Sequence, residues 1–204
     1  MPTDTAGQES PPSNQVLLQL PSWLTDSLHS LAARSLSLEE RMRLVLELAS
    51  RNVSEATGGP FAAAVFEASS GRLYAAGVNL VLSTNQATFH AEMVAILMAQ
   101  DRFGHYDLSL APGRSFELVT TTEPCLMCLG AVLWSGVRHL VCGARDADAR
   151  AVGFDEGPKP AAWVDELRAR GLGVTRDVLR PEAASLLREY AREGGIIYNP
   201  QRRP

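Results

Sequence analysis

Residues 121–130 read TTEPCLMCLG and place two of the chain's three cysteines three positions apart. A C-x-x-C pair can be a redox disulfide, half of a metal site or part of a packed core. Pro124 and the apolar run after it predict a helix with the proline in its first turn. Cys125 and Cys128 would then share one face of that helix, at the end where the macrodipole favours thiolates.

Composition limits the class of protein. A chain of 204 residues with 46% hydrophobic content can bury a full core as one domain without disulfides. The formal net charge of −4 weighs against a nucleic acid as the main partner, because phosphate binding needs a basic face. We find no signal peptide and no membrane-spanning run, so we expect a cytoplasmic protein without a membrane partner. Stable disulfides are rare in that compartment, which disfavours a structural disulfide.

Helical and strand patterns alternate along the chain. Residues 1–15 are rich in polar residues, glycine and proline, and predict a disordered tail before a single domain over 16–204. Predicted helices cover 37–53, opened by the capping box of Ser37 and Glu40, then 90–100, the cysteine helix, 161–171 and a segment opened by Pro181. Predicted strands cover the hairpin 61–68 and 73–81, then 116–122, 139–144 and 173–179, with a loop over 146–160. This order predicts an α/β fold whose sheet is covered on both faces.

A catalytic zinc site needs a third protein ligand beside the two cysteines, and keeps its fourth position open for water. Among the four histidines, His90 is the candidate because Glu92 follows it at the start of a predicted helix. We interpret His29, His105 and His139 as surface or packing residues. Positions i and i+2 point to opposite sides of a regular helix, so His90 must lie before helical geometry begins if both side chains are to face one site.

These residues together predict a zinc-dependent deaminase. His90, Cys125 and Cys128 would hold the ion, a water would fill the fourth position, and Glu92 would move its proton. The pattern H-x-E followed by P-C-x-x-C is the signature of zinc nucleobase deaminases. A thioredoxin-like redox pair would need neither His90 nor Glu92. A purely structural zinc site would be closed by four protein ligands and has no use for a proton carrier.

Four stretches carry a family resemblance: GGPFAAAVF (58–66), FHAEMVAI (89–96), TTEPCLMCLGAVLWSGV (121–137) and VGFDEGP (152–158). Over residues 35–200 the chain resembles the cytidine-deaminase-like superfamily and, more closely, its bacterial guanine deaminase branch. The resemblance implies a three-layer α/β/α sandwich with a central five-stranded mixed sheet, one zinc ion per subunit, and conversion of guanine to xanthine and ammonia. It also implies a homodimer, in which residues 157–204 could be exchanged between subunits.

The same resemblance assigns roles to residues around the zinc site. Asn79 would hydrogen-bond the purine, Phe61 and Trp134 would line the base pocket, and the backbone at Ala91 would help to fix the carbonyl. Glu156 would supply a second carboxylate for substrate contact and proton transfer.

Simpler interpretations of these residues stay open. Asn79 could be a turn residue, Glu156 a solvated loop charge and Trp134 a core residue, and Tyr198 is only a candidate for closing the site. The residues do not separate guanine from ammeline, isocytosine, cytosine or guanosine. A tRNA adenosine deaminase carries both motifs as well, but it would need a basic surface facing the RNA.

Overall fold

The computed structural model describes residues 14–199 except 32 and 33. The predicted tail, residues 1–15, lies almost wholly outside the described residues. Within them, no helix has the length and hydropathy needed to cross a bilayer.

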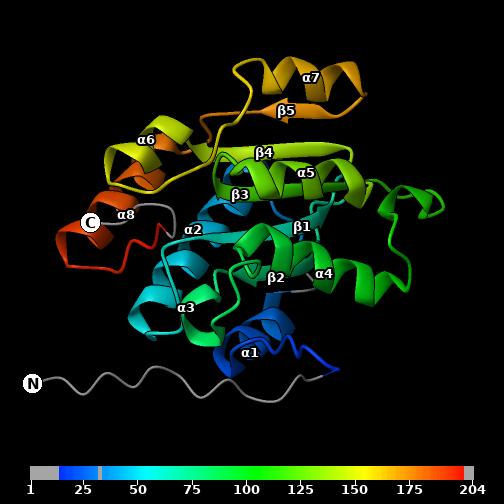
Figure 1. Cartoon of the computed structure of the whole chain (residues 1–204). Coiled ribbons are helices and arrows are strands. Elements are labelled where there is room, and N and C mark those ends of the chain that lie inside the picture. Colours follow the sequence, from blue (N-terminus) through cyan, green and yellow to red (C-terminus); the bar gives the residue numbers. More distant parts are fainter. Residues whose placement is uncertain (1–13, 32–33, 200–204) are drawn as a thin grey trace, which may run out of the picture.

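A five-stranded mixed sheet forms the centre of the molecule, with the strand order β2-β1-β3-β4-β5 (Figure 1). The strands are β1 (Ala62–Glu67), β2 (Leu73–Val78), β3 (Phe116–Thr122), β4 (His139–Ala144) and β5 (Gly173–Thr175). β1 pairs antiparallel with both β2 and β3, whereas β3, β4 and β5 run parallel. The predicted mixed sheet is confirmed.

Helices cover both faces of this sheet (Figure 1). α4 (Ala91–Phe103) and α5 (Leu126–Ser135) lie on one face, and α2 (Leu38–Ser54) and α8 (Arg180–Arg192) lie on the other. The remaining helical segments are α1 (Ser22–Leu31), α3 (Val81–Thr84), η1 (Leu108–Leu110), α6 (Asp146–Ala151) and α7 (Trp163–Ala169). The predicted three-layer α/β/α sandwich is therefore confirmed.

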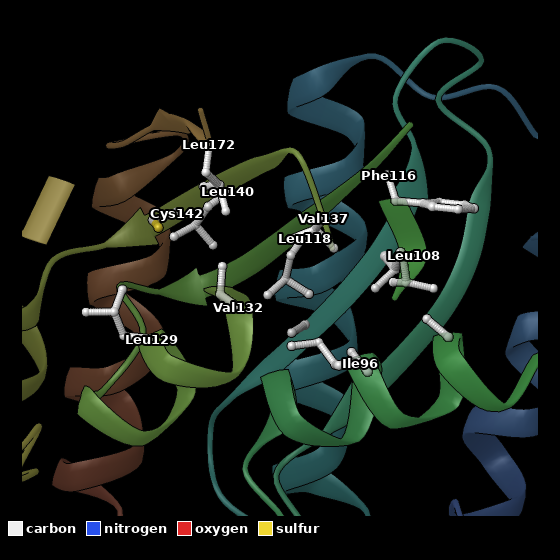
Figure 2. Packing of buried hydrophobic residues seen from close by; sticks show 14 of the residues in the cluster. Ile96, Leu108, Phe116, Leu118, Leu129, Val132, Val137, Leu140, Cys142 and Leu172 are labelled. Carbon is white, nitrogen blue, oxygen red and sulfur yellow. The ribbon is translucent and has the colours of Figure 1, made fainter. Parts of the chain in front are cut away.

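Alternation along the strands divides the core into two layers. In β1, Ala63 and Val65 join the cluster under α4 and α5, while Ala64 and Phe66 join the cluster under α2. Successive strand residues point to opposite faces, so a strand covered on both sides reads as an unbroken apolar run. Figure 2 shows the first cluster, with Ile96 of α4 and Val132 of α5 directed toward Leu118 and Leu140 of the sheet.

Most local predictions hold. The capping box of Ser37 and Glu40 opens α2, and Pro181 lies in the first turn of α8. The strands predicted over 73–81 and 173–179 are shorter and end at Val78 and Thr175. Two further expectations were wrong. Pro124 precedes the N-cap residue Cys125 instead of lying in the first helical turn. The predicted loop over 146–160 contains α6, whose Ala149 is buried in a small cluster with α8, so that tertiary packing supports a helix too short to be stable alone.

Candidate active site

Two helix N-termini meet at the predicted metal ligands. His90 is the N-cap residue of α4, with extended backbone angles φ −65° and ψ 156°, which confirms that it lies before helical geometry begins. Cys125 is the N-cap residue of α5, and Cys128 lies in the first turn of that helix. Nδ1 of His90 lies 3.5 Å from Sγ of Cys125 and 3.6 Å from Sγ of Cys128.

These three groups fit a zinc ion. Zinc bonds of about 2.1 to 2.3 Å at tetrahedral angles place ligand atoms roughly 3.6 Å apart, as found for His90 and each sulfur. Within the described residues, the site offers this one nitrogen and two sulfurs as a ligand group, a set typical of a site with one open position. The other ring nitrogen of His90, Nε2, is hydrogen-bonded to the hydroxyl of Tyr198. Such a bond fixes the ring orientation of a metal-binding histidine.

The surroundings favour a thiolate at the site. Hydrogen bonds from Cys128 and His90 outweigh the effect of burial and hold the pKa of Cys125 at about 4, against an ordinary value of 9.0. The hydrogen bond to Cys125 and burial raise the pKa of Cys128. A thiolate is the form that binds metal.

Glu92 lies in the first turn of α4 with its carboxylate buried. The hydroxyl of Thr120 donates a hydrogen bond to Oε1 of Glu92 over 3.3 Å. Burial raises the pKa of Glu92, the charge of Cys125 adds to this rise, and His90 opposes it. A buried carboxyl group at this position is placed to accept and to release a proton, as a general acid–base group must.

A cavity of about 480 Å³ opens in front of these groups. Its wall brings together six of the predicted site residues: Phe61, Asn79, His90, Glu92, Cys125 and Glu156. The ring of Phe61 meets that of Phe154 edge to face, with centroids 4.8 Å apart, which gives the cavity an apolar wall. Cys128 is fully buried behind Cys125.

Asn79 is held on both its backbone and its side chain. Asn52 Nδ2 donates to the carbonyl of Asn79 over 2.9 Å, and the backbone N–H of Val81 donates to Asn79 Oδ1 over 3.3 Å. The interpretation of Asn79 as a turn residue is therefore correct, but the side chain also lines the cavity.

Glu156 reaches the same cavity from the loop after α6. Only 7% of the residue is exposed, which excludes the interpretation as a solvated loop charge. Burial raises the pKa of Glu156 to about 8, the charges of Cys125 and Glu92 add to the rise, and Lys159 opposes it.

Trp134 and Ala91 differ from the other predicted residues. Trp134 is 83% exposed, so it neither lines the cavity nor lies in the core, and both predictions for it are wrong. It lies nine residues after Cys125, roughly 13 Å along α5, on the side away from the buried Val132 and Ser135. Ala91 is fully buried, and only its backbone N–H, which has no acceptor within the helix, is suited to the predicted role.

Sequence reasoning missed several residues of the site. Thr122 and Phe154 line the cavity, and the hydroxyl of Thr122 is buried without a hydrogen-bond partner among the described residues. Strand alternation could have indicated Thr120 and Thr122, because they share the face of β3 that Glu92 approaches. Tyr198, the candidate for closing the site, does line the cavity, but its contact with His90 joins residues 108 positions apart and no local pattern indicates it.

The chain is similar to several known deaminases. A family model described as the cytidine and deoxycytidylate deaminase zinc-binding region matches residues 36–144. Guanine deaminase of Bacillus subtilis is 36% identical over 118 residues, which are 58% of this chain and 71% of that protein. The tRNA-specific adenosine deaminase of Haemophilus influenzae is 35% identical over 115 residues, covering 56% of this chain and 62% of that protein.

Solved structures resemble a larger part of the chain. The structure of guanine deaminase from Nitrosomonas europaea is 46% identical, with a TM-score of 0.82, and the match covers 90% of this chain and all of that one. The protein NE0047 in complex with 2,6-diaminopurine is 49% identical, with a TM-score of 0.83, over 90% of this chain and 96% of that one. The family model spans more than half of the sequence and includes His90, Cys125 and Cys128, so the chain belongs to the family of deaminases that carry the cytidine and deoxycytidylate deaminase zinc-binding region.

Proposed function

We propose that this protein is a zinc-dependent hydrolase that converts guanine and water to xanthine and ammonia. The observation that carries the proposal is a single cavity walled by the His90 and Cys125 pair, Glu92, Asn79 and Glu156. Guanine offers a polar edge at N1 and its 2-amino group, and a flat apolar body. The cavity has carboxyl and amide groups for the edge and the ring of Phe61 for the body.

The similar proteins support this substrate. Variants of NE0047 with a replaced asparagine or a replaced glutamate were solved with 8-azaguanine. Those two positions lie the same number of residues apart as Asn79 and Glu156 do here. Asn79 can donate to and accept from a purine ring, and Glu156 can accept from the N–H groups of guanine.

The two buried carboxyl groups, those of Glu92 and Glu156, would carry out the proton transfers. Zinc held by His90, Cys125 and Cys128 would supply a water whose pKa is lowered toward about 7. Glu92 would take the proton of the attacking water and deliver it to a ring nitrogen, which makes the amino-bearing carbon electrophilic. Burial raises the pKa of Glu156 to about 8, so this carboxyl group could also give a proton to the departing amine, a step that Glu92 could perform as well. The backbone N–H of Ala91 would help to fix the carbonyl.

The remaining features of the proposal concern the whole chain. One zinc ion would bind per subunit, and residues 16–204 would form a single catalytic domain. The cytoplasm is the proposed location, because the site needs Cys125 and Cys128 in their reduced state, not joined in a disulfide. Two chains would form a homodimer, in which residues 157–204 could be exchanged.

Ammonia release from a panel of substrates tests the proposal. We expect guanine to give the highest kcat/KM when compared with guanosine, isocytosine, ammeline, cytosine, cytidine, adenosine and a tRNA anticodon stem–loop. A preference for cytidine or the stem–loop would overturn the substrate assignment. Metal analysis should give about one zinc per chain, and a clearly different content would contradict the proposed site.

Glu156→Ala tests the second carboxyl group. We expect this variant to retain zinc and to lose guanine turnover by roughly a hundredfold or more, the range for a positioned acid–base group. Guanine turnover at the rate of the unaltered chain would overturn the role proposed for Glu156.

A further inference from the structure

Lys159 stands out among the basic residues of the chain. It is the only lysine, beside 18 arginines. Lys159 lies close to the end of the loop that carries Glu156, and its side chain is only 5% exposed. Lysine is rarely buried unless its ammonium group is paired, so its contacts indicate its purpose.

The ammonium group of Lys159 joins three elements. Nζ donates a hydrogen bond to the carbonyl oxygen of Pro124 over 3.0 Å. It also lies 3.0 Å from Oδ1 of Asp146 and 3.9 Å from Oε2 of Glu123. The ring of Trp163 covers it, with Nζ 5.0 Å from the ring centroid. The charge is therefore compensated by two carboxylates and an aromatic face, away from water.

These contacts tie the loop of Glu156 to the turn that carries a metal ligand. Pro124 directly precedes Cys125. The backbone N–H of Leu126, which follows Cys125, donates to the carbonyl of Glu156 over 3.1 Å. Lys159 lies three residues after Glu156. The loop is therefore attached to the turn at two points: the carbonyl of Glu156 accepts from Leu126, and the ammonium group of Lys159 donates to Pro124. Between Glu156 and Lys159, Gly157 has a φ of +72° and accepts a hydrogen bond from the backbone N–H of Lys159 over 2.9 Å.

We infer that Lys159 is a positioning residue that holds Glu156 in register with the turn carrying Cys125. The inference rests on the proposed function, because it acts through the role of Glu156 there. A compact ammonium group with three donors suits this enclosed position between a carbonyl and two carboxylates, whereas the planar fork of arginine is larger and demands paired acceptors. This accounts for a lysine in a chain that otherwise uses arginine.

Lys159→Met tests the inference, with kcat/KM for guanine as the readout. We expect a fall of about tenfold to a hundredfold with zinc content unchanged, as for other residues that orient a reacting group. Arg176→Met is the matched control, because Arg176 pairs with the same Glu123 and stacks on Trp163 but has no hydrogen bond or ion pair to the loop 155–159 among the described residues. The control should lower the melting temperature and leave kcat/KM within about threefold of the unaltered chain.

A double-mutant cycle separates positioning from general stability. If Lys159 acts through Glu156, Lys159→Met should cost little further activity in a Glu156→Gln background. Losses that multiply in the double variant would overturn the inference, as would normal turnover by Lys159→Met alone. Absence of guanine turnover in the unaltered chain would instead overturn the proposed function.

A measurement on the unaltered chain covers the case in which Lys159→Met does not fold. A sample labelled with ¹⁵N-lysine carries one side-chain ammonium signal in NMR, that of Lys159. We expect this signal to shift on saturation with 8-azaguanine, and to shift much less in the Glu156→Gln variant under the same saturation. A signal that 8-azaguanine leaves in place in the unaltered chain would contradict the coupling.

Discussion

At the scale of single residues, the site depends on where two helices begin. His90 and Cys125 are both N-cap residues, so each side chain leaves an extended backbone, and the two meet across the gap between helix ends. Glu92 is the second residue of α4 and still faces the same cavity. An arrangement of this kind lets a three-residue motif present both a ligand and a proton carrier.

Glu92→Gln should separate proton transfer from metal binding. The amide has almost the shape of the carboxyl group and can still accept the hydrogen bond from Thr120, so the fold and the zinc content should be retained. We expect kcat for guanine to fall about a hundredfold to ten-thousandfold, because the amide cannot carry the proton. Steady-state kinetics together with metal analysis check this, and near-normal turnover in a zinc-loaded variant would refute the role.

At the scale of elements, the start of α4 depends on a close approach to the sheet. A Cβ atom at Gly77 in β2 would lie 2.4 Å from the backbone nitrogen of Ala95 and 2.6 Å from the carbonyl oxygen of Ala91. Both contacts are with backbone, which cannot turn aside as a flexible side chain can. Glycine at this position therefore sets the depth at which α4, with His90 at its end, packs on the sheet.

Gly77→Ala should consequently displace α4 and weaken the zinc site. We expect a loss of about 1 to 3 kcal/mol in the free energy of unfolding, the usual cost of overpacking, and weaker zinc retention against a chelator. Gly130→Ala is the control, because its Cβ would meet no atom within 4 Å and alanine favours the helix. Equal stability and zinc retention in the two variants would contradict this account of β2 and α4.

A buried ion pair joins the elements on the other side of the sheet. Glu117 of β3 pairs with Arg41 of α2, and its Oε2 lies 3.6 Å from Nδ1 of His139. Burial alone would raise the pKa of Glu117, but hydrogen bonds from His139 and Arg41 outweigh it and place the pKa below the ordinary 4.5. A carboxyl group whose pKa is lowered by folding stabilises the fold at pH values above its pKa in the unfolded chain. This stabilisation is lost as the pH falls toward its pKa in the folded chain.

We therefore expect the unaltered chain to lose stability as the pH falls below about 4.5, the ordinary pKa of a glutamate, and Glu117→Gln to lose less over the same interval. At pH 7 the variant should be less stable by about 3 kcal/mol, because Arg41 is left buried without its partner. Chemical unfolding at pH 7 and at acid pH measures these differences, with Glu39→Gln, a change of an exposed residue, as the control. Parallel pH profiles for the unaltered chain and Glu117→Gln would rule out this role.

The sequence predicts the elements and the metal ligands because both depend on local spacing. Apolar alternation, a capping box and the i, i+3 cysteines are visible without knowledge of the fold. It does not predict α6, which packing against α8 stabilises, or the contact of Tyr198 with His90, which depends on the path of 108 residues. The family resemblance placed Trp134 at the base pocket, but in this chain it is an exposed residue of α5.

At the scale of the whole molecule, one helix, α5, carries several exposed apolar side chains on its surface. α5 exposes four large apolar side chains, namely Leu126, Met127, Leu133 and Trp134. Two of them, Leu126 and Met127, also line the wall of the cavity, so this surface continues into the site. Contiguous apolar surface of this kind is typical of an interface.

We expect this surface of α5 to form the contact in the proposed homodimer. The unaltered chain should elute with twice the mass of one 22.0 kDa chain, and Trp134→Glu should elute as a monomer, because a charge cannot be buried unpaired in an apolar interface. Leu17→Glu is the control, since Leu17 is an equally exposed apolar residue outside α5 and should not change the mass. Light scattering during size-exclusion chromatography measures all three, and a monomeric unaltered chain or a dimeric Trp134→Glu would overturn the assignment of α5.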